Sequence, residues 1–138
     1  MEISATVRNS ARAHEALVRS GASSQSVSIA AKAAGRGSAV NGGELLMLAV
    51  ATCYCNDLFR EAARLGIPIE SVEVEASAEF PGVGLAATDI RYEARVQSPA
   101  PAADIARLLK ETDAVSEINN TIRAGVPVVL QGGQGTRP

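Results

Sequence analysis

The chain has no tryptophan, two phenylalanines, two tyrosines and one histidine. So few aromatic rings leave little on which a nucleic-acid base could stack. The 13 Lys and Arg residues against 15 Asp and Glu residues give no basic excess. Both features argue against a nucleic-acid-binding protein. Since 46% of the 138 residues are hydrophobic, we expect a single domain over residues 1–138 whose core is built from small aliphatic side chains.

Long apolar runs are also missing. The longest covers residues 45–55, is interrupted only by Thr52, and falls short of the roughly 20 residues that a membrane-spanning helix needs. A secretory signal has a basic stretch followed by an apolar run, and the first eight residues show neither. Together with only two cysteines, these features predict a cytoplasmic protein with reduced thiols and no membrane contact.

Ligands for metals and phosphates are scarce. His14, Cys53 and Cys55 are the whole supply of histidine and cysteine, whereas a zinc site needs three or four nitrogen or sulfur ligands. The glycine-rich stretch 35–43 lacks the Gly-Lys-Ser/Thr ending of a phosphate loop. We therefore expect no metal and no cofactor.

The order of apolar and polar residues predicts an α+β fold, with antiparallel hairpins in place of regular strand–helix alternation. Three N-terminal strands are expected to form an antiparallel meander, and a hairpin and a second helical region follow the long central helix. Gly125 should end the second helical region, and the tail 132–138 is expected to be frayed. The expected strands are 3–8, 13–18, 26–29, 72–80, 90–96 and 126–130.

The central helix is expected over residues 44–65. Asn41 and Glu44 have the spacing of a capping box, and Gly66 provides a stop. The first half of the helix is apolar nearly all round, which predicts cover by its own sheet and by a partner subunit. A polar face returns in the second half, with Asp57, Arg60, Glu61 and Arg64.

The two cysteines lie in this helix, about 200° apart around its axis, so they should point to opposite faces and form no disulfide. One interpretation is that both are small core residues. The other is a reactive thiol, which would need a cation brought in by the fold. Arg8, Arg12 and Arg36 are candidates for that cation.

Two segments resemble a known family. Residues 41–53, Asn-Gly-Gly-Glu-Leu-Leu-Met-Leu-Ala-Val-Ala-Thr-Cys, and residues 119–128, Asn-Asn-Thr-Ile-Arg-Ala-Gly-Val-Pro-Val, resemble motifs of the OsmC/Ohr family (osmotically inducible protein C and organic hydroperoxide resistance proteins). The resemblance implies an OsmC-like fold, an intertwined homodimer and active sites at the subunit interface. It also implies that Cys53 is the thiol that attacks an organic hydroperoxide.

Other family positions differ in this chain. Ser116 stands where the resemblance places the second, resolving cysteine, and Glu117 stands where the following proline is expected. Gly43 stands where the family has the glutamate that orients a thiolate-activating arginine. The arginine comes from the N-terminal strand region, which makes Arg8 or Arg12 the possible thiolate-stabilising residue.

Three outcomes of these differences stay open. Cys55 could act as a second thiol, although the helix opposes it. An external thiol could reduce the sulfenic acid of Cys53, since a serine hydroxyl cannot resolve it. Alternatively, peroxidase activity is lost and the chain binds a small apolar ligand at the dimer interface.

Overall fold

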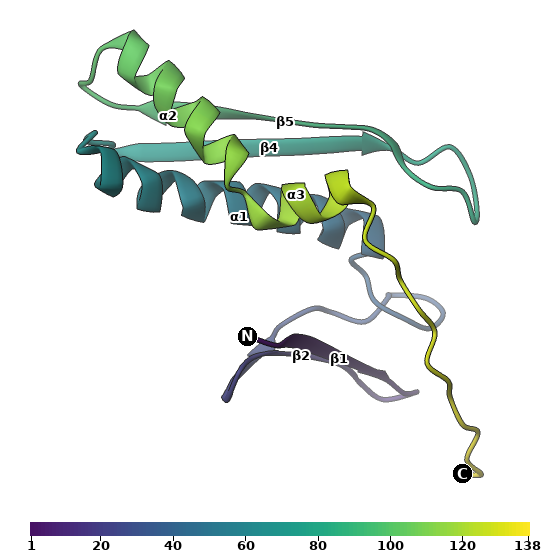
Figure 1. The fold of residues 1–138 in the computed structure, drawn as a ribbon. Coiled ribbons are helices and arrows are strands. Elements are labelled where there is room, and N and C mark those ends of the chain that lie inside the picture. Colours follow the sequence, from purple (N-terminus) through teal and green to yellow (C-terminus); the bar gives the residue numbers. More distant parts are fainter. The chain divides into compact units, whose positions relative to one another are not determined.

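The computed structural model describes residues 1–138, which divide into two compact units, Met1–Leu46 and Met47–Pro138. Figure 1 shows the helices and strands of both units, and the single-domain interpretation stays a prediction. None of the helices is long and apolar enough to cross a membrane. The elements in chain order are β1 (Ile3–Asn9), β2 (His14–Ser20), β3 (Ser23–Val27), α1 (Gly42–Leu65), β4 (Ser71–Glu79), β5 (Thr88–Gln97), α2 (Ala102–Ala114) and α3 (Glu117–Ala124).

The N-terminal strands form the predicted antiparallel meander, in the order β1-β2-β3. The β3 strand begins at Ser23, three residues earlier than expected, because a tight turn at Gly21 with φ of +57° reverses the chain directly after β2. Its first four residues are serine or glutamine and all five are exposed. This strand is therefore held by backbone hydrogen bonds to β2, and its sequence has no alternation of apolar and polar residues by which it could be predicted.

The long helix α1 ends at Leu65 as predicted and begins at Gly42, two residues before the predicted start. The Asn41 side chain accepts a hydrogen bond from the Glu44 backbone N–H at 2.8 Å, and the Glu44 carboxylate accepts one from the Asn41 N–H at 3.1 Å. This reciprocal pair is a capping box. At the other end, Gly66 has a φ of +69°, the left-handed conformation that commonly ends helices.

The β4–β5 hairpin has one half-buried and one exposed face, as the alternation predicted. Arg95 lies opposite Glu73 and binds its carboxylate at 3.1 Å. This pair is therefore an ion pair across the hairpin, although Glu75 faces Glu93. Phe80, the last residue of the strand expected over residues 72–80, follows the end of β4 and is 52% exposed.

The core of the second unit packs α1 and α2 against the inner face of this hairpin (Figure 1). Tyr54 and Leu58 of α1 and Leu108 of α2 are its buried centre. The Tyr54 hydroxyl donates to the Leu109 carbonyl at 2.7 Å, which ties α1 to α2. The Tyr54 and Tyr92 rings pack edge to face, with their centroids 4.6 Å apart. Aromatic pairs favour this arrangement.

The second helical region consists of two helices. A short break at Val115 and Ser116 separates α2 from α3, and Gly125 ends α3 with a φ of +61°. The last strand, expected over residues 126–130, is not formed. A strand needs a neighbouring edge for its backbone hydrogen bonds, and this segment pairs with no strand of the chain. Val128 is 99% exposed.

The Tyr54 phenol provides a test of the core. Its burial, together with the negative charge of Asp113, raises its pKa from 10.0 to about 12. Between these values an unfolded chain ionises its phenol while the folded chain keeps it neutral, so the free energy of unfolding should fall as pH rises through this range.

The measurement is an ultraviolet absorbance titration of Tyr92→Phe, in which Tyr54 is the remaining tyrosine. We expect ionisation only near pH 12. A midpoint near pH 10, while circular dichroism still reports folded protein, would show that Tyr54 is not buried in this way.

Candidate functional site around Cys53

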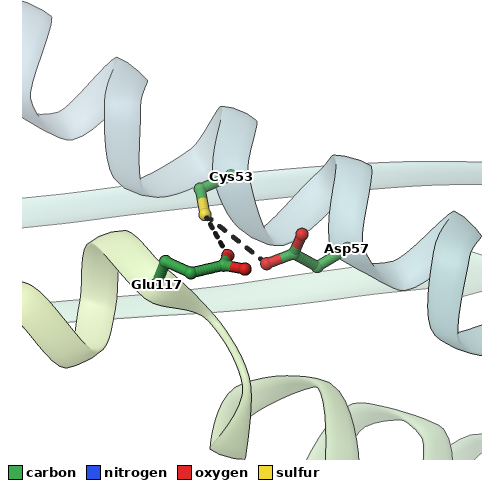
Figure 2. Close-up of side chains that lie close together, drawn as sticks. All are labelled: Cys53, Asp57 and Glu117. Atoms are coloured by element: carbon green, nitrogen blue, oxygen red, sulfur yellow. Dashed lines mark hydrogen bonds between the residues drawn. The ribbon is translucent and has the colours of Figure 1, made fainter. Parts of the chain in front are cut away.

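Cys53 lies on α1 inside a small cluster of polar side chains (Figure 2). Its Sγ is 3.4 Å from Asp57 Oδ2, one turn further along the same helix, and 3.8 Å from Glu117 Oε2. The thiol can donate its hydrogen to either carboxylate. From the other direction, the Ser116 hydroxyl donates to Sγ at 3.6 Å. The half-buried sulfur thus has both proton acceptors and a proton donor around it.

Ser116 is positioned by the start of α3. It is the N-cap residue of that helix, and a serine there usually accepts a hydrogen bond from an early helical N–H. Here its hydroxyl makes no such capping bond and turns to Cys53. The residue is completely buried. The break between α2 and α3 therefore places a hydroxyl against the thiol at the expense of the helix cap.

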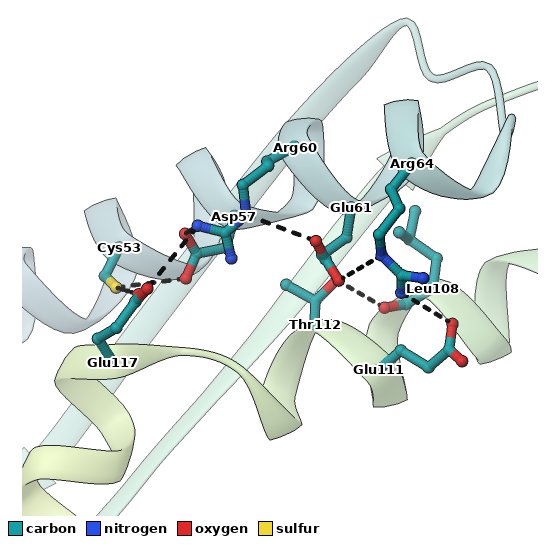
Figure 3. A network of polar contacts seen from close by, with 9 residues as sticks. All are labelled: Cys53, Asp57, Arg60, Glu61, Arg64, Leu108, Glu111, Thr112 and Glu117. Atoms are coloured by element: carbon teal, nitrogen blue, oxygen red, sulfur yellow. Dashed lines mark hydrogen bonds and ion pairs between the residues drawn. The ribbon is translucent and has the colours of Figure 1, made fainter.

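The polar face of α1 is buried in part, which differs from the solvent-exposed face that its charges suggest. Asp57 is 5% exposed and Glu61 is 6% exposed. A buried carboxylate is stable only when a cation or several hydrogen bonds compensate it. Arg60 and Arg64 supply that compensation from the same helix (Figure 3).

Arg60 connects the carboxylates of the site. Its Nη1 is 3.0 Å from Asp57 Oδ1 and 3.8 Å from Glu117 Oε1, and its Nε is 3.4 Å from Glu61 Oε2. The charge of Asp57 makes the largest contribution to raising the pKa of the guanidinium, ahead of its hydrogen bond to Glu61. Desolvation acts in the opposite direction. Arg60 is therefore a permanent positive charge beside the two carboxylates that contact Cys53.

The ion-pair network continues away from the thiol. Arg64 Nε binds Glu61 Oε1 at 3.0 Å, and Arg64 Nη2 lies 3.6 Å from Glu111 Oε2 on α2. Neither Glu61 nor Arg64 contacts Cys53 (Figure 3). The ion pair of Arg64 with Glu111, which joins α1 to α2, therefore lies away from the sulfur and is connected to the site only through Glu61 and Arg60.

Other residues named from the sequence have different places. Cys55 is a free, half-buried thiol outside the cluster. Arg8 lies on β1 and Arg12 in the turn that follows it, both in the first unit. Gly43 lies in the first turn of α1. The structure brings together Cys53 and Ser116, while the roles of the other residues stay predictions.

Asn119 adds an unpaired polar group on α3. It is 4% exposed, and neither its Nδ2 nor its Oδ1 has a hydrogen-bond partner. Residues three apart share one face of a helix, so Asn119 continues the line that begins at Ser116. Its Nδ2 group can donate hydrogen bonds to a water molecule or a ligand, and its Oδ1 can accept them.

A metal ion is the other ligand to consider. The sulfur of Cys53 and carboxylate oxygens of Asp57 and Glu117 all lie within 4.8 Å of one another. A count of nitrogen and sulfur ligands in the sequence misses this set, because two of its donors are carboxylates. Arg60 already pairs with both carboxylates, and we assign no metal site here. The expectation of no metal stays a prediction.

Asp57, Arg60 and Glu117 belong to the site although the sequence did not identify them as site residues. A signal for Asp57 was present, since residues four apart on a helix lie next to each other. Nothing in the local pattern pointed to Glu117, which is 64 residues from Cys53 in the chain. Its contact depends on how α3 packs beside α1.

The family described as OsmC-like protein matches residues 35–131, while no curated protein matches the sequence. An OsmC-like protein of Mycoplasma pneumoniae has a similar structure, with a TM-score of 0.63 at 15% identity over 88% of this chain and 86% of that one.

Two further solved structures are similar. One is an organic hydroperoxide resistance protein OsmC of Legionella pneumophila, described as a predicted redox protein and regulator of sulfide bond formation. Its TM-score is 0.60 at 16% identity over 89% of this chain and 90% of that one. The other is an OsmC-like protein of unknown function from Vibrio cholerae, with a TM-score of 0.57 at 14% identity over 88% and 93%. These similarities confirm the predicted α+β fold.

Proposed function

Because the chain belongs to the OsmC-like protein family, we propose that it is a thiol-dependent peroxidase in which Cys53 reduces organic hydroperoxides. Family membership supports a general redox or stress-response role. The similar structure from Legionella pneumophila is described as an organic hydroperoxide resistance protein, which supports this substrate class. Two free cysteines suit a reducing compartment such as the cytoplasm.

The observation that carries the proposal is the setting of the Cys53 sulfur. Peroxide reduction needs a thiol that can lose its proton and a donor that stabilises the sulfur as it becomes negative. Asp57 and Glu117 can accept the proton, and the Ser116 hydroxyl donates a hydrogen bond to Sγ. A cysteine that served only to fill the core would not need these contacts.

The chemistry is a one-cysteine cycle. The sulfur of Cys53 attacks the outer oxygen of the hydroperoxide, the O–O bond breaks, and an alcohol leaves while Cys53 becomes a sulfenic acid. Ser116 cannot form a disulfide with that sulfenic acid. An external dithiol therefore reduces it: one thiol forms a mixed disulfide with Cys53 and releases water, and the second thiol frees Cys53 and leaves the reductant as a disulfide.

We also propose a homodimer. Leu48, in the apolar half of α1, is 59% exposed, and Val128 in the unpaired C-terminal segment is 99% exposed. In the first unit, Ile3 and Val7 of β1 are more than 60% exposed. Large apolar side chains that are exposed to solvent in each unit favour an interaction site. A second copy of the chain would cover it and place the site of Cys53 at an interface.

A second candidate function is the binding of a small apolar ligand without turnover. The first turn of α1 favours it, since Gly43 has no side chain there with which to orient an arginine. The exposed leucines of the same helix half, Leu45, Leu46 and Leu48, would provide an apolar surface for such a ligand.

The first test is the consumption of cumene hydroperoxide with dithiothreitol or dihydrolipoamide as reductant. We expect turnover by the wild type and by Cys55→Ser, and none by Cys53→Ser, because only Cys53 has proton acceptors at its sulfur. The two single cysteine variants are matched controls for each other, since both thiols are half-buried on the same helix.

Loss of turnover in both variants would mean that Cys55 takes part as a second thiol. A folded wild type that consumes no hydroperoxide with either reductant would contradict the peroxidase proposal. In that case a binding function would account for the fold.

The homodimer is tested by light scattering coupled to size-exclusion chromatography. We expect a mass of twice 14.2 kDa for the wild type and a shift towards monomer for Leu48→Asp, because a carboxylate buried at an interface without a partner is costly. Val83→Asp, at a fully exposed position of the hairpin loop, should remain a dimer. A wild type that is monomeric at micromolar concentration would refute the assembly.

A further inference from the structure

Asp57 is an unusual carboxylate, because it is nearly buried and yet contacts the one atom at which the reaction would occur. Its exposed fraction is 5%, and its Oδ2 lies 3.4 Å from Cys53 Sγ. Its other oxygen, Oδ1, is held by Arg60 at 3.0 Å. Oδ2 thus faces the sulfur (Figure 2) while Arg60 holds Oδ1.

We propose that Asp57 is the proton carrier of the peroxidase reaction: it takes the proton of the Cys53 thiol and returns it to the leaving oxygen of the hydroperoxide. This inference rests on the proposed function. It gives Asp57 a catalytic role, because the carboxylate touches the reacting sulfur.

The geometry favours Asp57 over Glu117 for this role. Glu117 Oε2 is further from Sγ, at 3.8 Å, and the Glu117 side chain is 69% exposed. An exposed side chain exchanges its contacts with water, whereas the buried Asp57 keeps its place. Asp57 also lies on the same helix as Cys53, one turn away, so the backbone of α1 maintains the distance between the two groups.

Arg60 acts as a positioning residue. It contacts Asp57 and Glu117 but not the sulfur. By holding Asp57 Oδ1, it keeps Oδ2 directed to Cys53, and its positive charge compensates a carboxylate that would otherwise be buried alone.

The proton balance of the step is closed. The thiol proton moves to Asp57 Oδ2, and the sulfur electron pair forms the new S–O bond with the outer peroxide oxygen. The O–O bond breaks and its electrons stay on the inner oxygen, which takes the proton from Asp57 and leaves as an alcohol. Asp57 is a carboxylate again, and Cys53 carries the sulfenic acid.

The test compares two oxidants whose leaving groups differ in their need for a proton. The leaving group of cumene hydroperoxide is an alkoxide, which must be protonated. The leaving group of peracetic acid is acetate, which needs no proton. In the Cys55→Ser background, the loss of the Cys53 thiol in a single turnover is followed for each oxidant by quenching with a thiol-labelling reagent.

We expect Asp57→Asn to slow the reaction with cumene hydroperoxide about 100-fold, the lower end of general acid–base contributions. The reaction with peracetic acid should slow less, because it loses only the acceptor of the thiol proton and not the donor to the leaving oxygen. A merely structural role of Asp57 would slow both oxidants together, and Asp57→Glu should recover much of the rate with cumene hydroperoxide.

Glu61→Gln is the matched control, because Glu61 is buried to the same degree on the same helix and also contacts Arg60, but not Cys53. It should preserve the ratio of the two rates. Equal slowing by Asp57→Asn with both oxidants, or a ratio equal to that of Glu61→Gln, would overturn the proton-carrier role while wild-type turnover still supported the peroxidase. An inactive wild type would overturn both.

If Asp57→Asn does not fold, the wild type provides a second measurement. Proton transfer to the leaving oxygen should make the D₂O effect larger for cumene hydroperoxide than for peracetic acid, whose leaving acetate takes no proton. The same isotope effect for both oxidants would contradict the proposal.

Discussion

The compensation of buried carboxylates governs this structure. Asp57 and Glu61 lie one turn apart on the inner face of α1 and are almost inaccessible to water. Leaving either without its cation would cost about 3–5 kcal/mol. Arg60 and Arg64 satisfy them from the same helix, and Arg64 reaches on to Glu111 of α2. The charged face of α1 is therefore an internal contact surface, and the packing of the C-terminal helices is matched to it.

This compensation also creates the chemical environment of Cys53. The sulfur lies at the end of the charged face, where one oxygen of Asp57 remains free of Arg60 and points to it. The start of α3 adds the Ser116 hydroxyl, which gives up its usual capping role. Ser116 occupies the position that the family resemblance assigns to a second cysteine. In this chain the same place offers a hydrogen bond in place of a thiol, which suits a cycle completed by an external reductant.

Local features of the sequence predicted much of the fold. The capping box at Asn41, the stop at Gly66 and the alternation in β4 and β5 depend on neighbouring residues, so they can be recognised without tertiary information. Three features could not be recognised in this way. The β3 strand has too few apolar residues to alternate, the segment 126–130 lacks a neighbouring edge within the chain, and the contact of Glu117 with Cys53 depends on helix packing. The resemblance pointed to Cys53 and Ser116, whereas the sequence pattern identified Asp57 and Arg60 only as members of a polar helix face.

The most direct measurement of the central claim is mass spectrometry of the protein after one equivalent of cumene hydroperoxide in the presence of dimedone, which traps sulfenic acids. The account predicts a single dimedone adduct on Cys53, with Cys55 unmodified and no disulfide between them. An unmodified Cys53, or an adduct that forms on both cysteines alike, would contradict the claim that the polar cluster of α1 and α3 makes Cys53 the reactive thiol.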